Sequence, residues 1–186
     1  KFFKKVKLKP EKFVLLSFHP ETKTKIDLEF QLKIFEKIIK RIKIRFIISY
    51  PNADLGNEKI INFYKKIKKS CSNVTLIKNC GQDLFLNFIN YSYLMIGNSS
   101  SGIVEASFFD KIFINIGSRQ NGKVMPKNVY NVRWSEKNIV NIVNNLLKEK
   151  IYKKKIVTSN PYKERISASK ISKFITNTNL ISLKNF

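Results

Sequence analysis

The chain has 186 residues, of which 43% are hydrophobic and 12% aromatic, enough apolar material for one domain with its own core; this excludes a disordered chain. Its formal net charge of +23 raises the question of a nucleic-acid or anionic-membrane partner. Only five of the 36 basic residues are arginine, and the lysines are spread along nearly every segment. A lysine-rich composition therefore explains the charge better than a base-reading surface does, and nucleic acid is not an expected partner.

The cysteines and the apolar runs indicate the cellular compartment in which the protein is expected. Cys71 and Cys80 form no framework of paired cysteines, which favours a reducing environment. No apolar run approaches the roughly 18–20 residues of a membrane span. The basic segment 1–12 lacks the apolar core and cleavage site of a signal peptide. We therefore expect a cytoplasmic protein without a membrane partner, and the absence of an initiator methionine fits a fragment of a longer chain.

Short apolar runs alternate with amphipathic stretches along the chain. The runs predict strands at 13–18, 45–50, 73–77, 93–96, 111–116 and 129–134. The amphipathic stretches predict helices at 26–42, 58–69, 83–91, 102–109, 136–148 and 162–175. This alternation predicts an α/β domain with a Rossmann-like, doubly wound parallel sheet. Ligands of such sheets bind beyond the carboxyl ends of the strands, so the candidate loops are 19–24, 51–57, 97–102 and 117–123.

The segment Gly97-Asn-Ser-Ser-Ser-Gly-Ile-Val-Glu-Ala106 follows a strand and opens a helix. The hydroxyls of Ser99 and Ser100, together with the amides of a helix N-terminus, suit phosphate oxygens. Gly102 permits close approach of a ligand to the backbone. Glu105 lies about one turn into the helix, where its carboxylate can accept from paired ribose hydroxyls. The alternative interpretation is a serine N-cap with a polar linker.

Two further loops carry candidate residues. Arg119 follows the fifth predicted strand, and its guanidinium suits a phosphate or a carboxylate. A solvated loop arginine is the alternative. The sequence around Asn52 is typical of a turn, but it lies at the carboxyl end of the second strand, where it could line the same cleft.

His19 is the only histidine in the chain, so any imidazole chemistry falls there. It follows the first strand, where it could donate to a diphosphate or shuttle a proton, although a purely structural histidine fits equally well. One histidine and two separated cysteines argue against a zinc site, so we expect no metal.

Four segments resemble, in this order, motifs of the UDP-N-acetylglucosamine 2-epimerases. They are His19-Pro-Glu-Thr22, Asn52-Ala-Asp54, the 97–106 segment and Ile114-Asn-Ile-Gly-Ser-Arg-Gln-Asn-Gly122. The hydrolysing branch, which makes N-acetylmannosamine and related precursors of sialic-type sugars, is the most similar. Asn160-Pro-Tyr162 before the last helix also resembles the family. Two positions depart from it, because Lys123 replaces the usual arginine and Lys163-Glu-Arg165 replaces the usual Gly-Asp-Gly.

The resemblance implies a GT-B fold, in which two Rossmann-like domains hold a UDP-sugar between them. Residues 1–186 would be the single nucleotide-sugar-binding domain, the C-terminal half of the enzyme, with 161–186 a terminal helix and tail that packs on the N-terminal domain. His19 would be catalytic, beside the diphosphate and the leaving glycosyl oxygen, and 79–85 would border the uracil. UDP-binding residues would be Asn52, Ser99, Ser100, Gly102, Glu105 and Arg119.

The implied reaction removes the C2 proton, expels UDP to form a glycal and adds water, without a cofactor. The expected acids and bases belong to the N-terminal domain, so this half alone is predicted to be inactive. The alternatives within this class are the non-hydrolysing epimerase, a hydrolase of a UDP-diacetamido-trideoxy sugar and a GT-B glycosyltransferase. A stand-alone nucleotide or polyanion binding module is the alternative from another class. The sequence leaves open whether the protein forms a homo-oligomer.

Overall fold

The structure is a computed structural model that describes residues 2–21, 24–78, 81–148, 160–162 and 168–177. Within these ranges six strands form one sheet in the order β3-β2-β1-β4-β5-β6, and every neighbouring pair is parallel. The strands are β1 (Phe13–Ser17), β2 (Arg45–Ser49), β3 (Val74–Ile77), β4 (Leu94–Gly97), β5 (Phe113–Ile116) and β6 (Val129–Val132). All six predicted strands are confirmed. The strand order is that of a doubly wound Rossmann-like sheet, as predicted.

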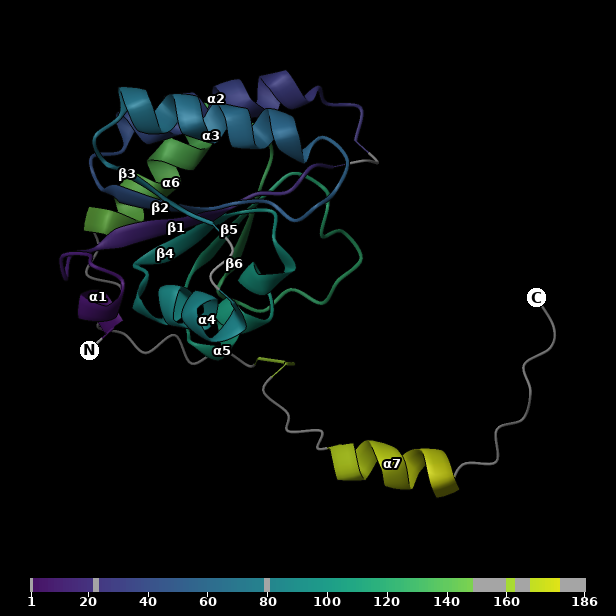
Figure 1. The fold of residues 1–186 in the computed structure, drawn as a ribbon. Helices are drawn as coiled ribbons and strands as arrows, with labels where there is room; N and C mark the ends of the chain where they lie inside the picture. The colour runs from purple at the N-terminus through teal and green to yellow at the C-terminus, as the bar shows by residue number, and fades with distance from the viewer. Residues whose placement is uncertain (1, 22–23, 79–80, 149–159, 163–167, 178–186) are drawn as a thin grey trace.

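Helices cover both faces of the sheet (Figure 1). One face carries α2 (Leu28–Arg41), α3 (Asn57–Ser70) and α6 (Glu136–Lys148). The other carries α1 (Phe2–Lys5), α4 (Gln82–Tyr91), the 3-10 turn η1 (Ser100–Gly102) and α5 (Glu105–Phe108). Because both faces are covered, the central strands β1 and β4 are buried along their whole length. The edge strand β6 is not, and its Tyr130 and Asn131 are exposed.

The helix α2 shows how local sequence sets an element. The carboxylate of Asp27 accepts from the backbone N–H groups of Glu29 at 3.0 Å and Phe30 at 3.2 Å, which caps the helix start. Leu32, Phe35, Ile38 and Ile39 then fall on one side of the helix and are buried against the sheet. The cap and the apolar side together account for a helix in this position.

The structure corrects several predicted elements. The predicted helix over 102–109 is divided into η1 and the one-turn α5. The start of α4 is at Gln82, with Gly81 in the N-cap position. The short α1 was not predicted; it is held by the aromatic rings of Phe2 and Phe3, which contact Phe88 and Tyr91.

The terminal segment also differs from prediction. Residues Pro161 and Tyr162 form a turn rather than the start of a helix, and the Tyr162 hydroxyl donates to the Val124 carbonyl oxygen at 3.0 Å. The helix α7 (Ala168–Asn177) follows, apart from the sheet and its covering helices in Figure 1. The described part of the chain contains no helix long and apolar enough to cross a membrane.

Candidate functional site

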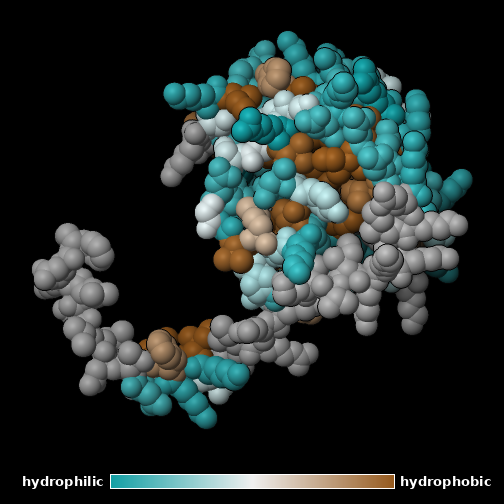
Figure 2. Space-filling model, turned by 180° about the vertical axis from the view of Figure 1, so that it is seen from behind, coloured by the Kyte–Doolittle hydropathy of each residue, from teal (hydrophilic) through white to brown (hydrophobic). Residues whose placement is uncertain are grey.

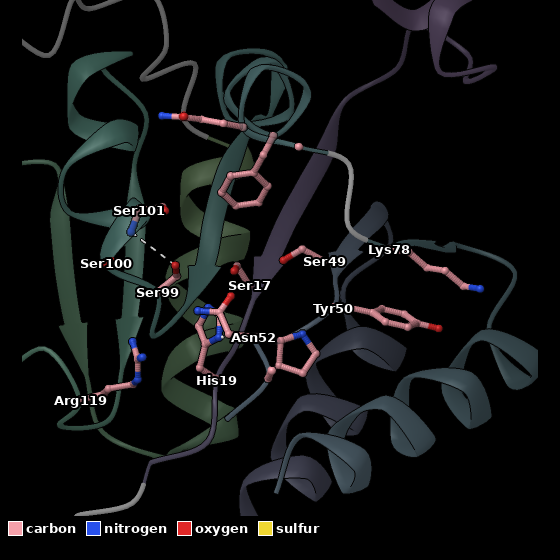
Figure 3. A pocket seen from close by; sticks show the side chains of 15 residues that line it. Ser17, His19, Ser49, Tyr50, Asn52, Lys78, Ser99, Ser100, Ser101 and Arg119 are labelled. Atoms are coloured by element: carbon pink, nitrogen blue, oxygen red, sulfur yellow. Dashed lines mark hydrogen bonds between the residues drawn. The ribbon is translucent and has the colours of Figure 1, made fainter. Parts of the chain in front are cut away.

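A pocket of about 630 Å³ opens at the carboxyl ends of β1, β2 and β4. The strand order reverses between β1 and β4, which is where doubly wound sheets bind their ligands. Figure 3 shows labelled side chains from five segments around this pocket. The predicted site residues that line it are His19, Asn52, Ser99, Ser100 and Arg119.

Gly97 allows the chain to turn closely over β1 at the end of β4. Its φ is +140°, and a Cβ at this position would lie 1.9 Å from the Ser17 carbonyl oxygen. Any other residue would push the two strands apart. After Asn98, the turn continues into Ser99, Ser100 and Ser101, all of which line the pocket.

The serine segment presents its polar groups where the chain enters η1. The Ser99 hydroxyl accepts from the Ser101 backbone N–H at 3.4 Å, so the predicted serine cap is present. The serine hydroxyls can donate to an anion, whereas the backbone N–H groups of Ser101 and Gly102 already donate to the hydroxyl and the carbonyl oxygen of Ser99. The cap and the anion-binding interpretations are therefore compatible, because Ser100 and Ser101 also line the pocket.

The His19 ring is buried, with 6% of the residue exposed. Its Nδ1 accepts from the Asn52 backbone N–H at 3.3 Å. A ring nitrogen that accepts carries no proton, so the neutral ring has its proton on Nε2. Burial, and then the positive charge of Arg119, lower the pKa of His19 from 6.5 to about 4, with a smaller opposing effect of Asp54. At neutral pH His19 is therefore an uncharged hydrogen-bond donor.

Arg119 enters the site from the loop after β5 (Figure 3). Its Nη1 donates to the Asn98 carbonyl oxygen at 3.2 Å. A guanidinium has five N–H donors, so further donors remain for an anionic ligand.

Two predicted site residues do not line the pocket. Gly102 is buried, and a Cβ there would lie 2.4 Å from the Phe113 ring, so its small size serves packing of η1 on β5. Glu105 is half-buried and begins α5, one turn beyond the serines. Of the predicted 79–85 border, Gly81, Gln82 and Phe85 line the pocket, whereas 79–80 lie outside the described residues.

The structure also reveals residues that the sequence analysis did not assign to the site. Ser17, Ser49, Tyr50 and Lys78 line the pocket. The fully buried Asn98 and the half-buried Glu21 lie behind it and join its loops. Both fall within the quoted motifs, but their partners are distant in sequence. Among the described residues no group of three His, Cys, Asp or Glu side chains could hold a metal ion.

Comparison with known proteins places the chain in a family. A family profile described as UDP-N-acetylglucosamine 2-epimerase matches residues 1–176. The Escherichia coli polysialic acid biosynthesis protein P7 is 34% identical over 157 residues, which cover 82% of this chain and 39% of that protein. The Legionella pneumophila UDP-N,N'-diacetylbacillosamine 2-epimerase (hydrolyzing) is 30% identical over 152 residues, with the same coverage. The chain thus spans about two fifths of the length of these relatives.

Solved structures show the same fold. The Methanocaldococcus jannaschii UDP-GlcNAc 2-epimerase in complex with UDP-GlcNAc and UDP matches with a TM-score of 0.72 and 20% identity, covering 95% of this chain and 48% of that one. The S. aureus MnaA–UDP co-structure matches with a TM-score of 0.69 and 19% identity, covering 95% and 47%. From the profile match and these relatives, we conclude that the chain belongs to the UDP-N-acetylglucosamine 2-epimerase family.

Proposed function

We propose that this chain is the UDP-binding half of a hydrolysing UDP-N-acetylglucosamine 2-epimerase, which releases UDP and N-acetylmannosamine for sialic-type sugar biosynthesis. The observation that carries the proposal is the convergence of Ser99, Arg119 and His19 on one pocket at the reversal of strand order. Hydroxyl donors, a guanidinium and a neutral imidazole suit a diphosphate and the glycosyl oxygen attached to it.

Each group has a distinct role in this proposal. The serines bind the diphosphate, and Arg119 neutralises part of its charge. The Nε2–H of His19 donates to the leaving glycosyl oxygen, where negative charge grows as the bond to the sugar breaks. Glu105, which lies half-buried one turn beyond the serines that line the pocket, is assigned the ribose hydroxyls. Asn52 lines the cleft and orients the imidazole through its backbone N–H. Groups outside this chain remove the C2 proton as UDP leaves to form the glycal, and then add water to it.

The sugar specificity rests on the relatives. Two relatives are named as hydrolysing enzymes, and both names refer to diacetylbacillosamine. They are the Legionella pneumophila enzyme at 30% identity and the Campylobacter jejuni GDP/UDP-N,N'-diacetylbacillosamine 2-epimerase (hydrolyzing), which is 33% identical over 120 residues. The Neisseria meningitidis UDP-N-acetylglucosamine 2-epimerase is 27% identical over 134 residues. A UDP-diacetamido-trideoxy-sugar hydrolase is therefore the second candidate, favoured by the names of these two relatives.

We also propose that the chain works with an N-terminal Rossmann-like domain in a GT-B arrangement, and that this half alone is inactive. Its coverage of about half of the solved enzymes supports this. The helix α7 carries apolar side chains along one side (Figure 2), and Ile171, Phe174 and Ile175 are 49%, 71% and 54% exposed. We assign this apolar side to packing on the N-terminal domain, in the cytoplasm where we place the enzyme.

The test is calorimetric titration of UDP into the 186-residue chain at moderate salt, with uridine and inorganic diphosphate as comparison ligands. Arg119→Ala should weaken UDP binding by about 1.5–3 kcal/mol, the cost of a charged hydrogen bond. Arg133→Ala is the matched control, because Arg133 is exposed and does not line the pocket. Glu105→Ala should weaken binding of UDP but not of diphosphate. Equal loss in both arginine variants would mean that net charge alone attracts the ligand, and would overturn the proposal.

A further inference from the structure

The side chain of Asn98 continues the pairing of β1 and β4 beyond the last residues of the two strands. The ladder ends at Ser17 and Gly97, and the Asn98 backbone N–H still donates to the Ser17 carbonyl oxygen at 3.2 Å. The Asn98 side chain then pairs with both backbone groups of His19. Its Oδ1 accepts from the His19 N–H at 2.8 Å, and its Nδ2 donates to the His19 carbonyl oxygen at 2.9 Å. The backbone that carries the imidazole is therefore held by two hydrogen bonds from one side-chain amide.

The backbone carbonyl of Asn98 holds a second group of the site. It accepts from Arg119 Nη1 at 3.2 Å and from Gln120 Nε2 at 2.7 Å. Asn98 is fully buried, and Gln120 is nearly so. One residue thus fixes His19 through its side chain and Arg119 through its carbonyl, without itself lining the pocket.

Glu21 makes a second connection between Asn98 and the loop after β5. Its Oε1 accepts from Asn98 Nδ2 at 3.3 Å, and its Oε2 accepts from the Ser118 hydroxyl at 3.1 Å and backbone N–H at 3.4 Å. Gly117 leaves room for this carboxylate, because a Cβ there would lie 2.3 Å from Oε1. Both carboxylate oxygens act as acceptors, so an amide cannot replace the group without turning donors toward donors.

We propose that Asn98 and Glu21 are positioning residues that hold His19 and Arg119 at the pocket, an inference that rests on the proposed function for its consequence in UDP binding. Asn98 contacts His19 and Arg119 directly, whereas Glu21 acts through Asn98 and Ser118, and neither of the two lines the pocket. Loss of either one should let the imidazole and the guanidinium move independently, which lowers affinity because both must then be ordered on binding.

The test uses two nearly isosteric variants. Glu21→Gln keeps one acceptor oxygen and places an NH2 group against either Ser118 or Asn98. Asn98→Asp removes the donor to the His19 carbonyl and sets a second carboxylate beside Glu21. Glu36→Gln is the matched control, since it removes one negative charge from α2, where Glu36 pairs with Lys40.

Three measurements are made on each 186-residue variant: the nitrogen NMR signals of the His19 ring, the affinity for UDP, and the midpoint of urea unfolding. Because His19 is the only histidine, its two ring nitrogens are assigned directly. We expect one dominant Nε2–H tautomer in the wild type and in Glu36→Gln. In Glu21→Gln the two nitrogen signals should move toward each other, and UDP affinity should fall by about tenfold. A merely structural role would lower the unfolding midpoint and leave the ring signals of the folded state unchanged.

Unchanged ring signals and unchanged UDP affinity in a folded Glu21→Gln variant would overturn the positioning role. If Asn98→Asp does not fold, Glu21→Gln alone decides. If the wild type does not bind UDP but the ring signals still change in Glu21→Gln, the positioning stands and the proposed function fails. If the wild type binds UDP and the variants keep both its ring signals and its UDP affinity, the proposed function stands and the positioning role fails.

Discussion

The backbone N–H of Asn52 donates to Nδ1 of His19 at 3.3 Å, so the loop after β2 selects the tautomer of the ring after β1. The contribution of Asn52 in the structure is thus a backbone contact, and its side chain is exposed at the pocket rim. This bond, together with burial, makes the imidazole a neutral donor through Nε2.

His19 should titrate far below the usual value for a histidine. Burial, with a further contribution from the charge of Arg119, lowers its pKa to about 4 from 6.5. Proton NMR of the single ring between neutral pH and about pH 3 measures this directly. A midpoint near 6.5 would show that the ring is solvated and free of the Asn52 bond.

The same shift predicts how stability depends on pH. The unfolded ring binds its proton near pH 6.5 and the folded ring only near pH 4, so the unfolded state holds more protons between these values. The contribution of His19 to the free energy of unfolding is therefore fully present above pH 6.5 and falls by up to about 3 kcal/mol as the pH drops to 4. Urea unfolding of the wild type and of His19→Gln checks this, because the variant should lose that part of the pH dependence.

Gly97→Ala should prevent normal folding or destabilise the domain by more than about 3 kcal/mol. The added Cβ would lie 1.9 Å from the Ser17 carbonyl oxygen, which belongs to the backbone and cannot rotate away. Gly81→Ala is the control, because Gly81 also has a positive φ but no atom within 4 Å of the added Cβ. With φ at 73° and ψ at 164°, Gly81 lies in a region that other residues rarely adopt, so this change should cost about 1–3 kcal/mol of backbone strain. Similar unfolding midpoints for the two variants would contradict the close approach of β4 to β1.

Asp27→Ala should lower the free energy of unfolding by about 1 kcal/mol, because it removes the cap of α2. Asp83→Ala provides a comparison in the first turn of α4, where Gly81 holds the N-cap position and no side chain caps the helix. Its effect should be a few tenths of a kcal/mol, through the helix dipole alone. Chemical denaturation distinguishes the two, and a larger loss in Asp83→Ala would reverse the assignment of the caps.

Phe174→Ser should leave the stability of the 186-residue chain within about 0.5 kcal/mol of the wild type. The ring is 71% exposed in α7, so the domain loses little buried surface. Phe35→Ser, at a fully buried position in α2, is the contrasting change and should cost several kcal/mol. If α7 packs on the N-terminal domain as proposed, Phe174→Ser should also weaken the association of two separately produced halves, measured by calorimetry.

The sequence alone was sufficient to predict the sheet, because strands buried on both faces are continuous apolar runs such as Phe13–Ser17. The amphipathic helices followed from spacing, as in α2 and α3. The site loops were predictable because ligands bind at the carboxyl ends of such strands. Where an element is short, the local signal was too weak: α1 depends on rings from α4, and η1 depends on the packing of Gly102 against Phe113.

The contacts that organise the site could be recognised only in the folded chain. Asn98 and His19 are 79 residues apart, and Glu21 and Ser118 are 97 apart. Each is a polar loop residue whose local sequence equally fits a solvated turn. The parallel sheet brings them together, because it aligns the carboxyl ends of β1, β4 and β5 at one edge. Composition and spacing therefore predict which loops meet there, whereas hydrogen-bond partners and the tautomer of His19 depend on distances that only tertiary packing sets.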